Sequence, residues 1–505
     1  MLKNIIANFG GSFWSVLSNF LFIPLYIKYL GIENYSIISF TLVIAGILSI
    51  MDAGLTTTLS REFASSENDY SARYNIFKTL ESCYFIIAAI TIAVVFLSSS
   101  FIAEKWLITE NTPKYEIILS LKIIAFEIGL RFLVGFYSGG LIGLNQQIAL
   151  NKYTIFWGVF RNGLAVIPIY FYHSLILFFT WQLFITAIYT IILRLKILKH
   201  ISIQNFYYAF FDKLQIRKPI LKKIYVFASG MLLISIVSAL NTQLDKLCLS
   251  KFLSIEVLGV YTLSFTIARM IYVISNPFMQ ASFPLFTSFY TGGKIKEAQK
   301  LYNQMMKIQG AFVYTALSII LIYGYDLLYI WNGDKNLSQD AAQYLPYIAV
   351  GIAISVMQEI PYNIARSNAY TLANNTLGMI SLILTLPGYY ILTQIYGAKG
   401  AAFTFSVTQL LLTIIYIYII NKRYIHFDIL KTYINYFIKP LFISIIPIFC
   451  ISKIYLLSDN RIISFIEICI IATINLCIVL LLTINKQNRK FYLGLLLNRI
   501  KNGNK

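Results

Sequence analysis

The residues of this chain that could do chemistry are charged side chains placed within long apolar segments. The basic ones are Lys122, Arg131, Arg161 and Arg269. The acidic ones are Asp52, Glu81, Glu127, Glu359 and Glu467. A charge at the centre of a membrane helix costs at least about 2.5–3.5 kcal/mol, so each is expected to face a cavity or a partner. Arginine in such a cavity suits a phosphate or pyrophosphate group, because its guanidinium donates two parallel hydrogen bonds.

Two arginines and a carboxylate stand out in the first half of the chain. Glu127 and Arg131 are four residues apart and therefore lie on one face of a helix. They form either a self-contained structural pair or part of a ligand site. Arg161 has no acidic residue near it in the sequence, and we predict that it faces a cavity. The embedded carboxylates Asp52, Glu127 and Glu359 could also bind H⁺ or Na⁺ and couple transport to an ion gradient.

Polar residues form a stripe along one long apolar segment of the second half. Asn276 and Gln280 follow Arg269 at spacings that place both within about 20° of it around a helix. We predict that this stripe faces a cavity, with hydrogen bonding between helices as the alternative. Pro277 and Pro284 predict a kink or break in the same segment.

Other polar residues recur at helical spacing further along. Glu359, Asn363 and Arg366 are separated by four and three residues, which predicts a second stripe. Arg366 is close to the predicted cytoplasmic end of its segment, so its alternative role is to reach the membrane surface. Asp52 and Arg61 are nine residues apart and are expected on opposite faces of a helix.

Three glycines spaced by four residues, Gly135, Gly139 and Gly143, form two overlapping G-x-x-x-G motifs. Small residues at this spacing let two helices approach closely. We predict close helix packing at this point.

Sequence motifs of enzymes and metal sites are missing. The chain contains neither H-E-x-x-H nor a glycine-rich phosphate loop after a strand. Its five cysteines form no C-x-x-C pair and its three histidines lie far apart, so we expect no metal and no cofactor. The sequence also offers no long loop to carry catalytic groups. We therefore predict that the protein is not an enzyme.

The composition decides the class of protein. Of the 505 residues, 58% are hydrophobic and 12% are charged, whereas soluble chains are about 45–50% apolar and about 25% charged. A soluble fold of this size could not bury so much apolar surface. The chain is therefore expected to be a polytopic membrane protein, which excludes soluble enzymes and DNA-binding proteins.

Apolar runs separated by charged or turn-rich breaks predict an all-α membrane protein with about 14 transmembrane helices. Turn signals separate these spans, among them those at Gly31 and Gly397. The predicted spans are 5–29, 36–60, 79–103, 117–141, 151–172, 174–193, 224–248, 256–289, 308–331, 341–365, 370–395, 400–421, 436–456 and 461–484.

The basic residues in the loops predict the orientation. With an even number of spans, both termini share one side, whose loops and ends hold 28 Lys and Arg residues against 9 on the other side. The positive-inside rule places that richer side in the cytoplasm. The net charge of +20 is thus expected to reflect topology, and no nucleic acid is expected as a partner.

Short repeats predict that the chain consists of two related halves. L-x-I-E occurs at 30–33 and 253–256, and N-x-Y-T occurs at 151–154 and 368–371. In both cases the second copy lies six predicted helices after the first, which is typical of parallel repeats in transporters. The predicted domains are an N-terminal six-helix lobe at 1–200, a basic amphipathic cytoplasmic linker at 201–223, a C-terminal six-helix lobe at 224–421, and two additional helices with a basic cytoplasmic tail at 422–505.

Several stretches of the first 300 residues resemble the bacterial O-antigen (lipid-linked oligosaccharide) flippases of the multidrug/oligosaccharidyl-lipid/polysaccharide exporter superfamily. They include M-D-A-G-L at 51–55 followed by Arg61, and L-D-K-L-x-L-S at 244–250. The others are K-N-I-I-A-N-F-G at 3–10, I-P-L-Y-I-K-Y-L-G-I-E-N-Y at 23–35, G-G-L-I-G-L-N-Q-Q-I-A-L-N at 139–151, G-V-Y at 259–261 and Pro284.

This resemblance implies a V-shaped bundle of two lobes related by pseudo-two-fold symmetry, with a central cationic cavity. It also implies translocation of an undecaprenyl-pyrophosphate-linked oligosaccharide repeat unit, of O-antigen or capsule type, from the cytoplasmic to the outer leaflet of the bacterial inner membrane. Alternating access would carry the substrate across. The residues that would contact pyrophosphate or acidic sugar are Arg61, Arg131, Arg161 and Arg269.

Other functions and partners stay open at this point. A multidrug or organic-cation exporter of the same fold is the first alternative, and a membrane polysaccharide polymerase or ligase is the second. Polysaccharide polymerase and chain-length proteins are candidate partners, and membrane lipids surround the chain. H⁺ or Na⁺ is the candidate coupling ion.

Overall fold

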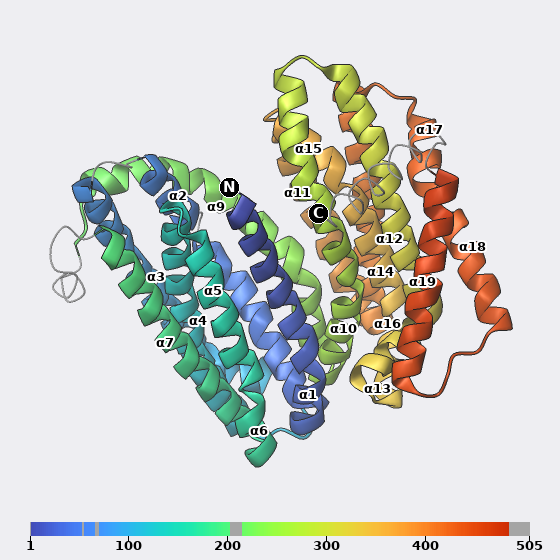
Figure 1. The fold of residues 1–505 in the computed structure, drawn as a ribbon. Helices are drawn as coiled ribbons and strands as arrows, with labels where there is room; N and C mark the ends of the chain where they lie inside the picture. The colour runs from blue at the N-terminus through green and yellow to red at the C-terminus, as the bar shows by residue number, and fades with distance from the viewer. Residues whose placement is uncertain (1, 53–54, 66–69, 202–214, 484–505) are drawn as a thin grey trace, which may run out of the picture. The chain divides into compact units, whose positions relative to one another are not determined.

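The computed structural model describes residues 2–52, 55–65, 70–201 and 215–483, and every regular element among them is a helix (Figure 1). The predicted all-α fold class is therefore confirmed. Most of the predicted linker, at 202–214, and the basic tail at 484–505 lie outside the described residues.

The chain divides into two compact units, Met1–Gly259 and Val260–Lys505. The helices of the first unit are α1 (Leu2–Leu48), α2 (Leu55–Ser65), α3 (Tyr70–Phe101), α4 (Lys114–Gly143), α5 (Gln147–Gly158), α6 (Val166–Tyr172), α7 (Leu175–Ile201) and α9 (Lys218–Phe252). Short helical turns extend several of the helices of both units, at 49–52, 102–106, 159–163, 421–425 and 434–438. The predicted lobes follow the repeat register, and that assignment stays a prediction.

The boundary between the units falls within α10 (Ile255–Ala268). The helices that follow are α11 (Met270–Thr291), α12 (Ile295–Asn332), α13 (Lys335–Ala342), α14 (Leu345–Met357), α15 (Glu359–Ser367), α16 (Leu372–Ile420), α17 (Ile429–Tyr433), α18 (Lys439–Ile454) and α19 (Arg461–Thr483).

Within the described residues, 11 segments are long and apolar enough to cross a membrane. Two long helices bend at a glycine with positive φ, α1 at Gly31 (82°) and α16 at Gly397 (60°), a conformation that glycine adopts readily. Both glycines lie in predicted turns. With α1 and α16 divided there, the predicted spans fall on helical segments, whereas the exact number of crossings stays a prediction.

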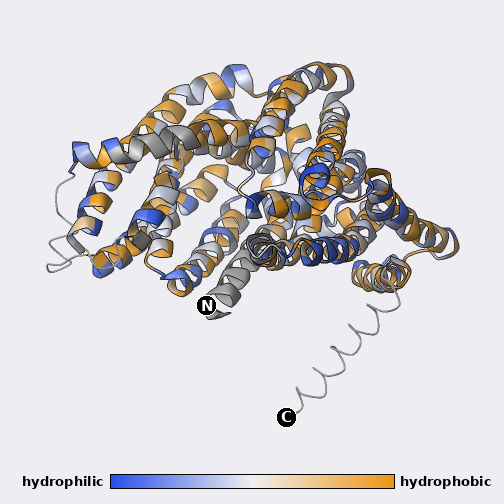
Figure 2. Ribbon diagram, turned by 90° about the horizontal axis from the view of Figure 1, so that it is seen from above, coloured by the Kyte–Doolittle hydropathy of each residue, from blue (hydrophilic) through white to orange (hydrophobic). Residues whose placement is uncertain are grey.

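Apolar side chains cover the outside of the helices. Figure 2 shows hydrophobic residues along the helices, with hydrophilic residues scattered between them. Large apolar side chains such as Leu97, Ile383 and Ile462 are more than two-thirds exposed, at 79%, 69% and 72%. Such surfaces are stable when they face lipid, because the hydrocarbon core of a bilayer accepts apolar side chains without cost.

In the first unit, α4 packs against α2, α3 and α7. The predicted close packing at the glycine motif is confirmed, because Gly139 and Gly143 both face α2. A Cβ atom on Gly143 would lie 2.5 Å from the carbonyl oxygen of Ser60, and one on Gly139 would lie 2.8 Å from that of Thr56. Because these two glycines have no side chain, α2 can pack directly against α4.

In the second unit, α12 packs against α11, α14, α18 and α19. A buried apolar cluster from α12, α18 and α19 consists of Ile319, Tyr323, Ile448, Ile468 and Ile471. The two additional helices predicted near the end of the chain are therefore packed on α12. On the other side of this unit, α11 packs against α15, which positions the polar residues discussed below.

The predicted kink in the proline-containing segment lies at another residue. Pro277 and Pro284 are both inside continuous α11, and the helix is interrupted earlier, at Arg269. There the amide of Tyr272 donates to the carbonyl of Arg269, three residues back, so the backbone tightens at this turn. Membrane helices tolerate proline when neighbouring groups satisfy the freed carbonyl. The interruption places Arg269 between α10 and α11.

Candidate functional site

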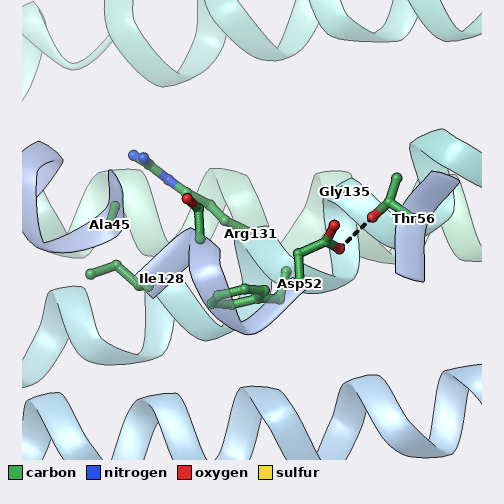
Figure 3. A pocket seen from close by; sticks show the side chains of 8 residues that line it. Ala45, Asp52, Thr56, Ile128, Arg131 and Gly135 are labelled. Carbon is green, nitrogen blue, oxygen red and sulfur yellow. Dashed lines mark hydrogen bonds between the residues drawn. The ribbon is translucent and has the colours of Figure 1, made fainter. Parts of the chain in front are cut away.

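A cavity of about 460 Å³ lies in the first unit, where the end of α1 and the following turn meet α2 and α4 (Figure 3). Its lining residues are Ala45, Ser49, Asp52, Thr56, Ile128, Arg131, Phe132 and Gly135. The cavity brings together two predicted site residues, Asp52 and Arg131, which are far apart in the sequence. The close approach of α2 to α4 makes this possible, since Thr56 packs against the glycine face of α4.

Asp52 is held by two hydroxyl groups. Its Oδ1 atom accepts a hydrogen bond of 2.6 Å from Thr56 Oγ1, and a further hydrogen bond from the hydroxyl of Tyr84. Figure 3 shows Asp52 turned toward Thr56, while the guanidinium of Arg131 points away from both. Both described hydrogen bonds end on Oδ1, so the cavity presents a carboxylate acceptor near α2 and a guanidinium donor on α4.

Glu127 lies behind Arg131 and is fully buried. Its Oε1 atom accepts a hydrogen bond of 2.7 Å from Arg131 Nε and one of 3.1 Å from Arg161 Nε. Thr186 also donates to this oxygen, at 3.2 Å. The predicted pair of Glu127 and Arg131 is confirmed. Sequence spacing alone did not reveal that Arg161, from the turn after α5, shares the same carboxylate.

Arg161 is buried within a polar network, with 8% of its surface exposed. Its Nη2 atom donates to Gln182 Oε1 at 2.6 Å, and its Nη1 atom donates to Asn162 Oδ1 at 2.9 Å. The ring of Trp157 covers the guanidinium at 5.4 Å. The sequence carried one signal for this network, because Gln182 and Thr186 are polar residues one helical turn apart in an otherwise apolar segment. Whether Arg161 contacts substrate stays a prediction.

Two guanidinium groups therefore share one carboxylate, which leaves one positive charge in excess within this cluster. The side chain of Arg131 is one-quarter exposed, whereas that of Arg161 is 10% exposed. Arg131 is thus the member of the cluster that lines the cavity, whereas Arg161 is buried and holds Glu127 through its hydrogen bond. In a site of low dielectric constant, this excess charge attracts an anion more strongly than it would in water.

A second buried ionic cluster in this unit was not predicted. Glu81 on α3 accepts hydrogen bonds of 2.7 Å from Arg194 Nε and 2.8 Å from the Tyr137 hydroxyl. The ammonium of Lys78 lies 3.7 Å from the same carboxylate and is fully buried. Lys78 and Arg194 each lie one residue outside a predicted span, at 79–103 and 174–193. In the structure Arg194 of α7 and Tyr137 of α4 both donate to Glu81 of α3, and Lys78 lies beside this carboxylate on the same helix.

The remaining predicted site residue of the first unit, Arg61, is exposed on α2 and lies outside the residues that line the cavity. Asp52 lines the cavity and Arg61 does not, which agrees with the prediction that they lie on opposite faces of a helix. The role of Arg61 in binding stays a prediction.

In the second unit, Arg269, Asn276 and Gln280 are all exposed. Arg269 lies over the ring of Phe265 at 5.8 Å, and it has no carboxylate partner among the described residues. Asn276 and Gln280 make no hydrogen bond within the part of the chain that the structure describes. Whether these three residues face a cavity stays a prediction.

Glu359, Asn363 and Arg366 lie along one continuous helix, as their spacing predicts, but they differ in burial. Glu359 Oε2 accepts a hydrogen bond of 2.8 Å from Ser275, and Asn363 Nδ2 donates to the carbonyl of Met279 at 2.8 Å. Asn363 is fully buried, whereas Arg366 is exposed. Since α11 packs on α15, all three side chains meet it: Glu359 at Ser275, Asn363 at Met279 and Arg366 at the ring of Phe283.

The apolar spans and the polar clusters buried between them define a multi-pass membrane protein. The sequence profile described as polysaccharide biosynthesis protein matches residues 1–290, more than half of the chain, and the chain belongs to this family. A second profile, MatE, matches residues 228–391.

Individual proteins agree with this assignment. A "Putative O-antigen transporter" of Shigella flexneri is 19% identical over 382 residues, which cover 76% of this chain and 88% of that protein. The fold is similar to lipid II flippase MurJ in an inward closed conformation, with a TM-score of 0.74 at 14% identity over 98% of this chain and 100% of that one. It is also similar to an inward-facing multidrug resistance MATE family transporter of the MOP superfamily, with a TM-score of 0.65 at 13% identity over 83% and 96% of the two chains. The predicted resemblance and exporter fold are confirmed.

Proposed function

We propose that this protein is a flippase that moves an undecaprenyl-pyrophosphate-linked oligosaccharide repeat unit from the cytoplasmic to the outer leaflet. The observation that carries the proposal is membership of the polysaccharide biosynthesis family over residues 1–290, the stretch that contains the cavity with Arg131. A transporter of anionic glycolipids needs a donor such as arginine at a polar cavity.

The cavity in the first unit supplies a specific arrangement for such a substrate. Arg131 would donate to the pyrophosphate, because it is partly exposed and belongs to a cluster with an excess positive charge. Asp52 would accept hydrogen bonds from sugar hydroxyls, because its carboxylate lines the same cavity. Arg161 would act through Glu127, by holding this carboxylate so that Arg131 can turn to the substrate. Arg61 and Arg269 are proposed as further contacts along the path.

The transport cycle would be alternating access, in which two halves of the chain change their relative position. The proposed orientation has both termini in the cytoplasm of a bacterium, with the chain in its inner membrane, following the distribution of Lys and Arg. H⁺ or Na⁺ is the proposed coupling ion. Asp52 and Glu359 are the candidate carboxylates for it, because neither forms an ion pair among the described residues.

Conditional depletion in the native host tests the flippase directly. Lipid-linked repeat units should accumulate on the cytoplasmic leaflet, where a membrane-impermeant reagent such as periodate does not oxidise their sugars in intact cells. Opening the cells should make the same sugars reactive. Repeat units that still reach the outer leaflet at the normal rate would contradict the proposal.

A second candidate function is the export of drugs or organic cations. The MatE profile over residues 228–391 and the similarity in fold to a MATE transporter favour it. This function would require an acidic cavity for the cation, whereas the cavity here contains Arg131 beside Asp52. Unchanged surface glycan together with lowered resistance to cationic dyes in depleted cells would favour this candidate over the flippase.

A further inference from the structure

Two arginines of the second unit lie on aromatic rings near the end of α11. The guanidinium of Arg366 is 4.6 Å from the ring centre of Phe283, and that of Arg423 is 4.3 Å from the ring centre of Tyr370. The ring of Tyr424 is 6.0 Å from those of Tyr290 and Tyr370. Six residues form what we call the stacked-arginine surface, and they come from α11, from α15 and the turn after it, and from the helical turn at 421–425: Phe283, Tyr290, Arg366, Tyr370, Arg423 and Tyr424.

The positive charges of this surface are not neutralised. Arg366 and Arg423 are both exposed, and neither has a carboxylate within ion-pair distance among the described residues. The nearby Asp428 is paired instead with Lys431, at 3.8 Å. Among the described residues, the two guanidinium groups make one hydrogen bond, from Arg423 Nε to the Tyr424 hydroxyl, so their other N–H groups are available to a ligand. The edge of a guanidinium is the part that binds a phosphate with two hydrogen bonds.

The surface continues the polar face of α11. At 100° per residue, Phe283 and Tyr290 lie on the same side of α11 as Asn276, within roughly 40° of it. Asn276 and Gln280, which are exposed on this side, lie between Arg269 and Phe283. Arg269 and Tyr290 are separated by roughly 30 Å along the helix axis, which is about the thickness of the hydrocarbon core. One face of α11 thus joins Arg269 to the stacked-arginine surface.

We propose that the stacked-arginine surface is a loading subsite that binds the pyrophosphate group of the lipid-linked substrate before this group reaches Arg269. The inference rests on the proposed flippase function and on the orientation that places Arg366 and Arg423 at the cytoplasmic side. Two guanidinium groups without counter-charges complement a group with several negative charges, such as a pyrophosphate. A phospholipid phosphodiester carries one negative charge and fits the pair less well.

Binding measurements with purified full-length protein in phosphatidylcholine nanodiscs test this subsite. The probes are geranylgeranyl pyrophosphate and, as the competing source of phosphate, dioleoylphosphatidylglycerol. We expect R366A/R423A to weaken binding of the pyrophosphate about tenfold or more, since hydrogen bonds to a charged group are lost. R366K/R423K should restore only part of the affinity, because lysine keeps the charge and loses the two-pronged geometry.

Arg461 provides a matched control. It also lies over a ring, that of Tyr329 at 5.7 Å, and donates to the carbonyl of Ile330, but it belongs to α19 and not to the stacked-arginine surface. R461A should bind geranylgeranyl pyrophosphate as the wild type does. Unchanged pyrophosphate binding in R366A/R423A would overturn the subsite. The subsite would also be overturned if R366A/R423A lost affinity only for phosphatidylglycerol, or lost affinity equally for phosphatidylglycerol and geranylgeranyl pyrophosphate. The surface would then be a general phospholipid site.

The failure of this inference can be separated from failure of the flippase function. If depletion causes cytoplasmic accumulation of repeat units while R366A/R423A binds pyrophosphate normally, only the loading subsite is wrong. If depleted cells export repeat units normally, the flippase function itself is wrong.

Discussion

The arginines of the two units are stabilised in different ways. In the first unit, Arg131 and Arg161 share the buried carboxylate of Glu127. In the described part of the second unit, Arg269, Arg366 and Arg423 lie on aromatic rings and have no carboxylate partner. A buried ion pair is costly to break because one charge is stranded, whereas an exposed arginine on a ring can be removed at little cost. Substitutions in the first unit should therefore affect folding as well as transport, and those in the second unit mainly transport.

The largest expected effect is that of Glu127→Gln, because it leaves two guanidinium groups without their carboxylate. We expect a loss of about 5 kcal/mol in the free energy of unfolding, at the upper end for a broken buried pair. Glu359→Gln is the matched variant in the second unit. It should lose less than about 1 kcal/mol, since Glu359 has a single described hydrogen bond, from Ser275. Unfolding by SDS in mixed micelles measures both. Equal losses of unfolding free energy in the two variants would contradict the different stabilisation of the two units.

Arg161→Ala should come next, with a loss of about 3 kcal/mol and reduced flipping. It removes contacts to Glu127 and Gln182, yet Arg131 still neutralises the carboxylate. Arg131→Ala should unfold less readily than Arg161→Ala, because Arg131 is more exposed and Arg161 keeps its place on Glu127. The same SDS titration ranks the two variants, and the reverse order would show that Arg131 is the structural member of the cluster.

Gly143→Ala tests the helix packing that supports the cavity of the first unit. A Cβ at this position would lie 2.5 Å from the Ser60 carbonyl oxygen, so we expect overpacking to cost about 1–3 kcal/mol. At Gly135 the nearest atom is 3.9 Å away, and Gly135→Ala should be tolerated. Thermal unfolding of the two variants checks this, and similar midpoints would mean that α2 shifts freely against α4.

The smallest effect on stability is expected for Arg269→Ala. Its described contact is the ring of Phe265, worth less than about 1 kcal/mol at an exposed site. Flipping should nevertheless fall about tenfold if Arg269 binds the pyrophosphate. Membrane amount and unfolding midpoint are the controls, measured beside the accumulation of lipid-linked repeat units. Wild-type surface glycan in this variant would remove Arg269 from the transport path.

Features within one helix could be predicted from the sequence. The pair of Glu127 and Arg131 follows from helical spacing, and the structure contains it. Contacts between helices could not be predicted in the same way. Arg161 meets Glu127 because α4 packs beside the turn after α5, and Asn363 is buried because α15 packs on α11. Spacing gives the face of a residue on its own helix but not the neighbour that the face meets.

The most direct test of the proposed flippase function uses purified protein in proteoliposomes that contain an undecaprenyl-pyrophosphate-linked repeat unit. Translocation is followed as the gain of periodate-reactive sugar on the opposite leaflet. We expect translocation by the wild type and a rate about tenfold lower for the stably folded Arg269→Ala variant. Wild-type liposomes that translocate no faster than protein-free liposomes, or an Arg269→Ala rate equal to that of the wild type, would contradict this expectation.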